Sequence, residues 1–382
     1  MINNKWILVA GILALGAGAT LSYDYFTAKK NQQDERVGKT IVEQDKLLSV
    51  DTIIGKTGKK EIKLTRDADN NWNTASDGGF PSEAKKVADF LDSIGKVEFQ
   101  RLVSTDKAKF GEFGIEFPDK PDSPLSDKTI QVRLLSQEKS ILTLNLGDAR
   151  SSGGQYVTVG DEARVFLVDQ KISLELESAS WELKTLVNVK KEDIASMEFH
   201  PPIGSGKSPV KFVWEESPPV KPEDATAAGE KPLAGLKMQG LVSPEKEKAG
   251  ALSQVETAFA DIRFLKRIPM SDPQASQDAA KSQLSAYHAV VTAKDGRSYD
   301  LAIGHIEGTT KDDKGKYYVK VLASKNPSTP GDAPVEKGIE RLNKLMDQYI
   351  FEISSYHAEK LIKAREDFLE NPEAMRPTAK KD

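Results

Sequence analysis

The sequence predicts an α+β fold in which an N-terminal transmembrane helix is followed by two diverged repeats, each a mainly antiparallel sheet with one main helix. Three observations lead to this prediction. Residues 6–23 contain no charged side chain, although the rest of the chain is polar. The two halves of the remaining sequence repeat one order of strand and helix patterns. Within each half, strand patterns follow one another without alternating βαβ units, and such runs are typical of antiparallel sheets.

The uncharged stretch at residues 6–23 predicts a membrane anchor. With a rise of about 1.5 Å per residue, a helix over this stretch spans roughly 27 Å, which covers most of a bilayer core. Aromatic residues at both ends suit the level of the lipid headgroups. We therefore expect an anchor at residues 1–28, with bilayer contact through residues 6–26, and a juxtamembrane linker at residues 29–46.

A cleaved signal peptide is the alternative to an anchor, because Lys5 gives a short basic start and Ala17-Gly18-Ala19 resembles a cleavage site. The count of Lys and Arg on either side of the stretch would place the large domain in the cytoplasm. A short basic start before an apolar core is nevertheless typical of export. The absence of cysteine also fits an oxidising compartment. The sequence therefore favours an extracytoplasmic domain.

The composition is that of an ordinary folded protein. Of the 382 residues, 38% are hydrophobic and 29% are charged, which fits about two domains. The formal net charge of −4 gives no electrostatic argument for nucleic-acid binding. We therefore expect no nucleic acid among the partners.

The best-matched blocks of the two halves are residues 130–147 and residues 287–304. Each block alternates apolar and polar side chains, passes through a polar turn, and ends a second strand in glycine. This pattern predicts a β-hairpin with one buried face. A third matching strand follows each hairpin, at residues 155–159 and residues 317–321.

A helix and a strand precede each hairpin in the prediction. Pro81-Ser82-Glu83 opens the first helix and Ser243-Pro244-Glu245 opens the second, since serine is a good N-cap and proline suits the first helical position. Apolar side chains then recur at helical spacing, namely Val87, Phe90, Leu91 and Ile94 in the first half and Leu252, Val255 and Phe259 in the second. The further predicted strands are 49–54, 61–66 and 97–102 in the first half, and 194–200, 210–215 and 262–268 in the second.

The domain boundaries follow from these patterns and from composition. The sequence predicts a first repeat at residues 47–188, a second repeat at residues 189–370, a flexible loop at residues 217–240, a second mobile loop at residues 269–283, and a disordered tail at residues 371–382. The longer loop is rich in Pro, Ala, Gly, Glu and Lys and has few large apolar residues.

The order of these features resembles a known bacterial family. The features that carry the resemblance are Asn71-Trp72-Asn73 after a strand hairpin, the helix opened by Pro81-Ser82, the turn at residues 113–118, the hairpin that ends in Leu146-Gly147-Asp148, and the strand at residues 156–159. The family is catalogued only as a domain of unknown function (DUF), and its membrane-anchored members are often encoded beside gliding-motility-type ABC transporter components. The resemblance covers most of residues 49–187 and, more weakly, residues 189–369. It carries no catalytic residue and implies a membrane-tethered accessory protein.

Two motifs resemble catalytic or nucleotide-binding signatures. Gly204-Ser205-Gly206-Lys207-Ser208 matches the end of a phosphate-binding loop, but a strand pattern follows where a helix N-terminus is needed, so we interpret it as a hairpin turn. Ser82-x-x-Lys85 and Ser243-x-x-Lys246 match a motif of penicillin-recognising enzymes. Lys56-Thr57-Gly58 precedes them, whereas those enzymes have it after the serine, so we interpret both serines as helix caps.

The histidines and carboxylates form no tight ligand motif. His200, His288, His305 and His357 all lie in the second half, and a zinc site built from distant histidines stays open. Residues 67–71 resemble the start of a calcium loop but lack its glycine and distal glutamate, so we interpret them as a solvated turn. We therefore predict no catalytic, cofactor-binding or metal-binding residue, and no cofactor.

Together these observations predict a non-enzymatic accessory or scaffold protein of the bacterial inner (cytoplasmic) membrane. It would be single-pass, with a large periplasmic domain that binds a membrane-protein partner such as an ABC-type transporter complex. Two alternatives stay open. One is an extracytoplasmic hydrolase of cell-envelope material, with a carboxylate pair as its site. The other is a periplasmic ligand-binding protein that is released by cleavage after Ala19.

Overall fold

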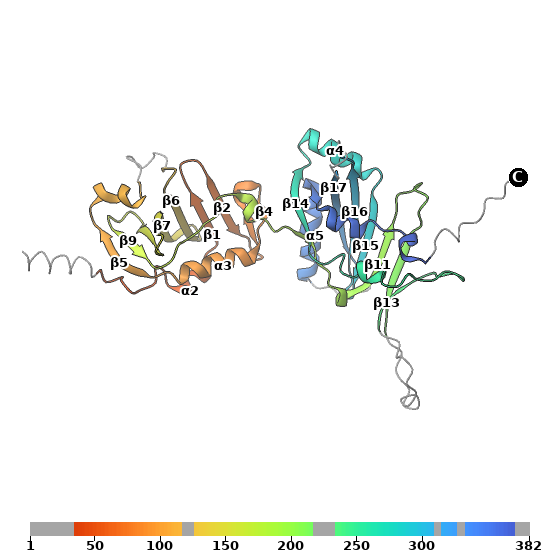
Figure 1. Cartoon of the computed structure of the whole chain (residues 1–382). Coiled ribbons are helices and arrows are strands. Elements are labelled where there is room, and N and C mark those ends of the chain that lie inside the picture. The colour runs from red at the N-terminus through yellow and green to blue at the C-terminus, as the bar shows by residue number, and fades with distance from the viewer. Residues whose placement is uncertain (1–33, 117–125, 217–233, 309–314, 327–332, 371–382) are drawn as a thin grey trace, which may run out of the picture. The chain divides into compact units, whose positions relative to one another are not determined.

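The computed structural model describes residues 34–116, 126–216, 234–308, 315–326 and 333–370. The chain divides into two compact units, residues 1–183 and residues 184–382. Each unit is built on one nine-stranded sheet (Figure 1).

The first unit has the strand order β4-β3-β2-β1-β6-β7-β8-β9-β5, and all neighbouring strands are antiparallel. Its helices and strands are α2 (Gln44–Leu48), β1 (Thr52–Lys56), β2 (Glu61–Arg66), β3 (Trp72–Thr74), β4 (Phe80–Pro81), α3 (Ala84–Gly95), β5 (Phe99–Ser104), β6 (Ile130–Ser136), β7 (Lys139–Ala149), β8 (Gln155–Val159) and β9 (Val165–Val168). Its 3-10 helices are η1 (Ala75–Asp77), η2 (Lys107–Phe113) and η3 (Ser178–Ser180).

The second unit has the strand order β10-β14-β18-β17-β16-β15-β11-β12-β13, again with all neighbours antiparallel. Its helices and strands are β10 (Thr185–Val187), β11 (Ile194–His200), β12 (Val210–Glu215), β13 (Gly235–Met238), β14 (Ile262–Pro269), α4 (Pro273–Gln283), β15 (Tyr287–Ala293), β16 (Arg297–Ile306), β17 (Lys316–Lys325), α5 (Ala333–Gln348), β18 (Tyr349–Ile353) and α6 (Ser355–Leu361). Its 3-10 helices are η4 (Lys191–Asp193), η6 (Leu252–Gln254) and η7 (Arg365–Phe368).

The two sheets repeat one order of eight strands. The order β5-β9-β8-β7-β6-β1-β2-β3 of the first sheet corresponds, strand by strand in chain order, to β14-β18-β17-β16-β15-β11-β12-β13 of the second. The additional strand lies at opposite ends of this order, β4 next to β3 in the first sheet and β10 next to β14 in the second. The strand order and the cross-strand registers together therefore supply a residue-by-residue correspondence between the two units.

The first unit buries one sheet face against α3, which lies along the sheet together with α2 (Figure 1). Val87, Phe90 and Ile94 recur on one side of α3 and are buried, as expected for an amphipathic helix. Trp181 meets Phe90 edge-on at 6.0 Å between ring centres. Its indole N–H donates to the carbonyl of Glu175 at 2.8 Å, so the buried ring leaves no polar atom unsatisfied.

The second unit packs four phenylalanines together in its core. The ring of Phe199 lies 6.1 Å from Phe259 and 6.0 Å from Phe368, and Phe368 lies 4.9 Å from Phe212. All four are less than 2% exposed. Burying each such ring contributes roughly 1.5–3 kcal/mol, so this cluster is a main source of stability in the unit.

The predicted fold class is wrong, because the molecule is mostly antiparallel sheet with few helices. The main helix expected after Ser243 in the second repeat is not an α-helix; its residues form turns and η6. Val255 and Phe259 are nevertheless fully buried. Their helical spacing therefore reflects burial in the core and not an α-helix. Gly250 has a φ of +75°, which interrupts any helix at this place.

The helices of the second unit occur elsewhere. α4 occupies the segment that the sequence assigned to a mobile loop at residues 269–283, and α5 and α6 follow β17 and β18. Residues 235–238, inside the expected loop at 217–240, form the edge strand β13. Residues 217–233 of that loop lie outside the described residues.

The predicted transmembrane helix has no counterpart in the described part of the chain. No helix among the described residues is both long enough and apolar enough to cross a membrane. Residues 1–28, where the anchor was predicted, and the predicted tail at 371–382 lie outside the described residues.

Candidate functional site

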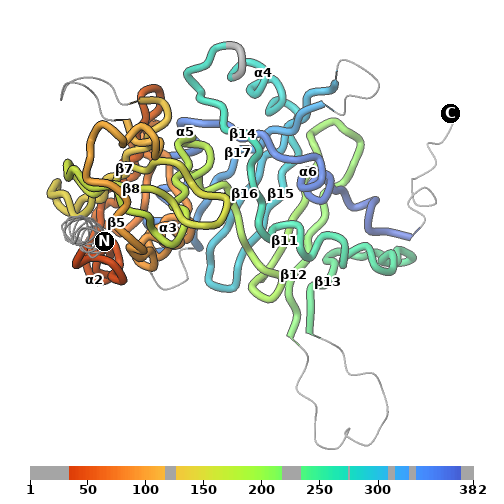
Figure 2. The backbone as a smooth tube through the Cα atoms, turned by 60° about the vertical axis from the view of Figure 1, so that its left-hand side comes forward, coloured from red at the N-terminus to blue at the C-terminus, as the bar shows by residue number. Residues whose placement is uncertain are grey.

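Among the described residues, one face of the second sheet is covered by a helix at one end. There Ala279 of α4 packs with Ile268, Tyr318 and Ile350, and α4 lies at one end of β16 and β17 (Figure 2). Further along, the side chains that alternate with buried ones on β12, β11, β15, β16 and β17 are partly or fully exposed. We call this side of the five strands the open face.

The strand register arranges the open face in cross-strand rows. The first row is Lys211, Glu198, Val290, Asp300 and Leu322. The second row is His200, His288, Ala302 and Lys320. The third row is Val213, Ser196, Thr292, Ser298 and Ser324. The open face therefore presents ionisable groups beside a row of hydroxyls, with one large apolar side chain, Leu322, that is 63% exposed.

Two carboxylates hold the two neighbouring histidines. Nδ1 of His288 lies 2.9 and 3.2 Å from the two carboxylate oxygens of Asp300. Nε2 of His200 lies 3.3 Å from Oε2 of Glu198, whose Oε1 accepts from Lys211 at 2.9 Å. Burial raises the pKa of Glu198, but the hydrogen bonds and charges of Lys211 and His200 outweigh it and lower the pKa below its usual value. Glu198 is therefore an anion at neutral pH.

The corresponding positions of the first sheet carry a different set of side chains. In the order His200, Glu198, His288 and Asp300, they hold Lys56, Ile54, Gln131 and Thr143. Gln131 donates to Asn145 at 3.0 Å, and Asn145 donates to Thr158 at 3.0 Å. Asn145 and Thr158 are buried. The first sheet thus places an amide and hydroxyl ladder beside Lys56 here, whereas the second sheet places histidine and carboxylate side chains.

The remaining histidines lie apart from the open-face pair. His305 stacks on Tyr317 with 4.3 Å between ring centres. His357 lies in α6, where burial lowers its pKa, and its Nδ1 is buried without a hydrogen-bond partner in the described structure. Among the described residues, no group of three or more His, Asp or Glu side chains is placed to hold a metal ion.

The nucleotide-like motif lies in the turn between β11 and β12, and strand β12 follows it, not a helix. The backbone N–H of Ser208 donates to the carboxylate of Glu366 at 3.1 and 3.3 Å. Lys207 donates to the hydroxyl of Tyr287 at 3.3 Å. These groups satisfy one another, so the motif forms a hairpin turn without a phosphate cradle.

The serine motif also has a structural role. Ser82 is buried and shares a hydrogen bond of 3.0 Å with the hydroxyl of Thr74. Lys85 pairs with Asp89 on the exposed side of α3. The N-cap of α3 is Glu83, so the expectation that Ser82 caps this helix is wrong.

The segment that resembles the start of a calcium loop, residues 67–71, forms a closed turn. Asp67 accepts hydrogen bonds from the backbone N–H groups of Asp69 and Asn71, both at 2.9 Å.

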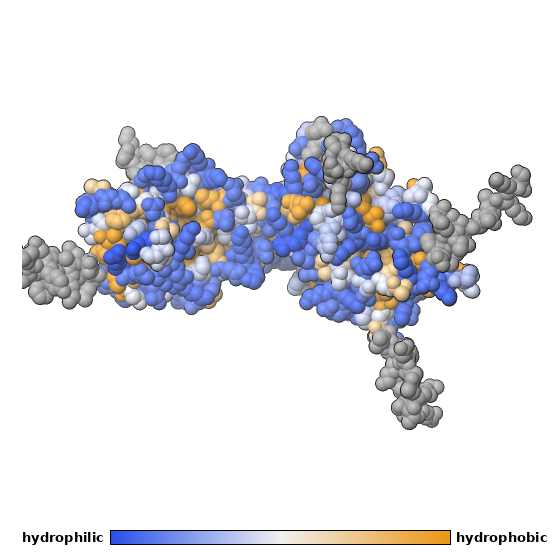
Figure 3. All heavy atoms as spheres, in the orientation of Figure 1, coloured by the Kyte–Doolittle hydropathy of each residue, from blue (hydrophilic) through white to orange (hydrophobic). Residues whose placement is uncertain are grey.

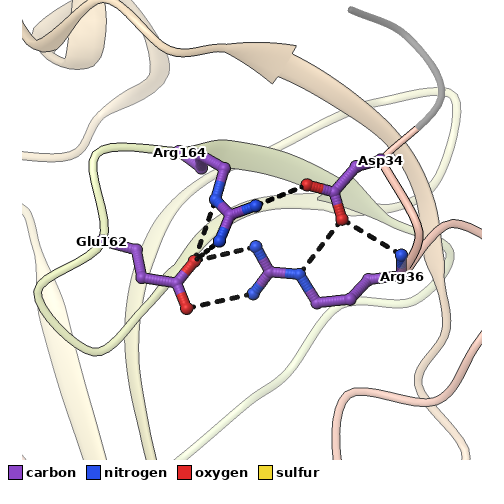
Figure 4. A network of polar contacts seen from close by, with 4 residues as sticks. All are labelled: Asp34, Arg36, Glu162 and Arg164. Carbon is purple, nitrogen blue, oxygen red and sulfur yellow. Dashed lines mark hydrogen bonds and ion pairs between the residues drawn. The ribbon is translucent and has the colours of Figure 1, made fainter.

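A second charged cluster joins the start of the described chain to the first sheet (Figure 4). Arg36 contacts Asp34 at 3.2 Å and Glu162 at 2.8 Å, and Arg164 contacts the same two carboxylates at 2.8 Å each. The guanidinium of Arg36 also lies 4.4 Å from the ring centre of Phe166. Burial raises the pKa of Asp34, but its contacts with Arg36 and Arg164 outweigh this and lower it. We call these four charged residues the arginine ring.

The arginine ring holds part of the segment that the sequence assigned to a linker at residues 29–46. Ile41 and Val42 in that segment are also buried, and the backbone N–H of Gly38 donates to Phe99 at 2.7 Å. The described part of this segment is therefore packed on the first unit.

A hollow of about 540 Å³ lies beside α5. Its lining is mostly charged and includes Lys325 and Glu336, which contact each other at 3.6 Å. Asn343 lines it too, but both amide atoms of that side chain bond the backbone of Ala323 at 2.9 and 2.8 Å. Asn343 thus pairs with the edge of β17 in the way a neighbouring strand would. The described lining of the hollow includes no Ser, Thr or His side chain.

Comparison with known proteins gives one match. Residues 72–255 fit the model of a protein family. That family is DUF4340, a domain of unknown function. No curated protein and no solved structure matches the chain. The resemblance to a domain of unknown function is therefore confirmed for these residues, while the membrane anchor and the transporter neighbours stay predictions.

Sequence reasoning missed the proximity of His200 and His288. The sequence shows only that each histidine lies on the polar side of a predicted strand, His200 at the end of residues 194–200 and His288 near the start of residues 287–304. The pairing of β11 with β15, which are far apart in sequence, sets the two opposite each other, and the register of such a pair is not written in local sequence.

Proposed function

We propose that this protein is a non-enzymatic accessory or scaffold protein, held at the bacterial inner membrane through residues 6–26, whose periplasmic body binds a protein partner. The partner that fits this proposal best is an ABC-type transporter complex, because the family resemblance implies one. The match of residues 72–255 to DUF4340 supports the family alone.

The observation that carries the proposal is the open face of the second sheet. Leu322 is 63% exposed, and its row continues through Asp300 to Glu198 and Lys211. An apolar anchor beside charged groups resembles the centre and rim of a protein interface. The strands already hold these side chains in register, so binding would require little additional ordering. Hydrophilic residues cover most of the visible surface of the unit, with hydrophobic ones in small patches (Figure 3).

The test is affinity purification of the full-length protein from its native membrane in mild detergent, followed by mass spectrometry. We expect the permease and ATPase subunits of an ABC-type transporter to co-purify in stoichiometric amounts. The variant Leu322→Glu should lower their recovery, because it places a charge where the partner buries an apolar side chain. Leu48→Glu is the matched control, since Leu48 is 78% exposed on the first unit.

Other outcomes separate the alternatives. Folded protein that is extracted quantitatively and recovered alone contradicts the proposal and favours the hydrolase or the ligand-binding protein. A mature N-terminus at Thr20 favours the released ligand-binding protein. Equal recovery of transporter subunits with Leu322→Glu and with the parent removes the open face as the docking surface.

A further inference from the structure

The neighbouring histidines of the open face support an inference that does not depend on the proposed partner. We propose that His200 and His288 bind one divalent transition-metal ion of the zinc class, with Glu198 and Asp300 as carboxylates that orient the two rings.

The strand register brings the two imidazoles within reach of one ion. His200 on β11 is the direct cross-strand partner of His288 on β15. Directly opposed residues have Cβ atoms about 4.5–5.5 Å apart on one face of the sheet. Two imidazoles at that separation can converge on one ion at zinc-to-nitrogen distances of about 2.0–2.1 Å. The side chains are 45% and 46% exposed, so an ion can reach them.

Each histidine already has the carboxylate partner that metal-binding histidines usually have. A ligating imidazole typically binds the metal through one nitrogen and donates its other N–H to a carboxylate. Asp300 holds Nδ1 of His288, and Glu198 holds Nε2 of His200. Among the described residues, nothing hydrogen-bonds Nε2 of His288 or Nδ1 of His200. Those two atoms are therefore the proposed ligands.

Lys211 strengthens this arrangement on the Glu198 side. Its contact with the second oxygen of Glu198, at 2.9 Å, holds that carboxylate in place. With two protein nitrogens as ligands, water completes the coordination shell, so the site is open, unlike a four-ligand structural zinc site. Imidazole nitrogen selects zinc-class ions over Mg²⁺, which prefers oxygen.

The first unit supplies an internal comparison. Its corresponding positions hold Lys56, Ile54, Gln131 and Thr143, and none of these pairs an imidazole with a carboxylate. The proposal therefore assigns the metal to the second unit alone. It also identifies His288→Gln as the natural substitution, because Gln131 occupies the same place in the first sheet.

The experiment titrates Zn²⁺ into the full-length protein in detergent, purified through a tag without histidine, and measures bound zinc by equilibrium dialysis. We expect one zinc ion per chain and no binding of Mg²⁺ under the same conditions. His200→Gln and His288→Gln should each weaken zinc binding by at least about tenfold, while His305→Gln, a control on the same sheet, leaves it unchanged. Asp300→Asn should weaken binding by about 10–100-fold.

A purely structural role for these residues predicts a different pattern. Under the metal-site proposal, the thermal midpoint in EDTA should be the same for the parent and for every variant. A loss of zinc affinity then reports a change in the site and not in the fold. In the parent protein, zinc should also protect His200 and His288, but not His305, from diethyl pyrocarbonate. Absence of zinc binding, zinc binding that both histidine variants retain, or equal modification of all three histidines would overturn the proposal.

Discussion

The sheets of the two units share eight strands in one order, yet they differ in the elements that cover them and in the side chains that they present. In the first unit Gln131, Asn145 and Thr158 form a hydrogen-bonded ladder, of which Asn145 and Thr158 are buried. In the second unit the corresponding strands carry His288, which is exposed, and Lys320, which is half-buried, at either side of Ala302. The difference indicates that the first sheet uses this place for stability and the second leaves it available for binding.

The units also differ in how they fill the core next to their sheets. The first unit uses α3, with Phe90 on its buried side, and the second unit uses turns around η6, with Phe259 buried. Both side chains come from the same place in the chain order, after β3 and before β5 in the first unit and after β13 and before β14 in the second. The buried aromatic side chain is common to the two units, but the helix that carries it is not.

The largest expected effect tests whether these two core positions are equivalent. Phe90→Ala and Phe259→Ala should each lower the free energy of unfolding of their own unit by about 3–5 kcal/mol, because each removes a buried ring and leaves a cavity. Chemical denaturation followed by hydrogen exchange of peptides from each unit measures the two separately. A loss below about 1 kcal/mol for Phe259→Ala would show that the turn segment is not part of the core.

The next effect concerns two corresponding glycines. Gly147 on β7 faces the carbonyl of Phe113, and Gly304 on β16 faces the carbonyl of Ser282, so a Cβ at either site would collide with backbone. Gly147→Ala and Gly304→Ala should each lower the free energy of unfolding of the unit concerned by about 1–3 kcal/mol.

The matched control for the glycine pair is Gly338→Ala. Gly338 lies in α5, and a Cβ there would meet no atom within 4 Å. The Gly338→Ala variant should stabilise the second unit by about 0.5–1 kcal/mol, because alanine is a better helix former than glycine. If Gly147→Ala were neutral while Gly304→Ala was destabilising, then η2 would not pack against the first sheet as closely as α4 packs against the second.

Local pattern in the sequence located the strands far better than the helices. Alternating side chains marked the hairpin of β6 and β7 and that of β15 and β16, since a strand with one buried face leaves a period of two in its own residues. The same reasoning failed after Ser243, where helical spacing of apolar residues reflected tertiary burial. α4 was missed because its first half is polar and offers no apolar stripe.

The open face could not be predicted from local pattern at all. Its histidine pair depends on β11 lying beside β15, although three other strands, β12, β13 and β14, separate the two in the chain. The motifs that a sequence scan does find, such as Gly204 to Ser208, proved to be turns. The open face and the proposed metal site depend on strand register, which is set by the whole sheet.

The smallest expected effect compares two carboxylates whose pKa is lowered, one in each unit. Asp34 is the more enclosed, with a side chain 5% exposed between two arginines, whereas Glu198 is 28% exposed beside Lys211. A carboxylate with a lowered pKa stabilises the fold above its unfolded pKa, and this stabilisation is lost as the pH falls through the folded value. For Asp34 the loss begins near the usual value of 3.8 and continues below it.

Asp34→Asn should therefore reduce the acid-induced loss of stability of the first unit by about 1 kcal/mol. Glu198→Gln should reduce the corresponding loss in the second unit by less, because exposed ion pairs contribute about 0–1 kcal/mol. Denaturation of each variant from neutral pH to below the carboxyl pKa, with hydrogen exchange read for each unit, measures both effects. An Asp34→Asn curve parallel to the parent would mean that the arginine ring does not hold the chain start on the first sheet. A larger effect at Glu198 would reverse the comparison and make the open face a stability element instead of a binding surface.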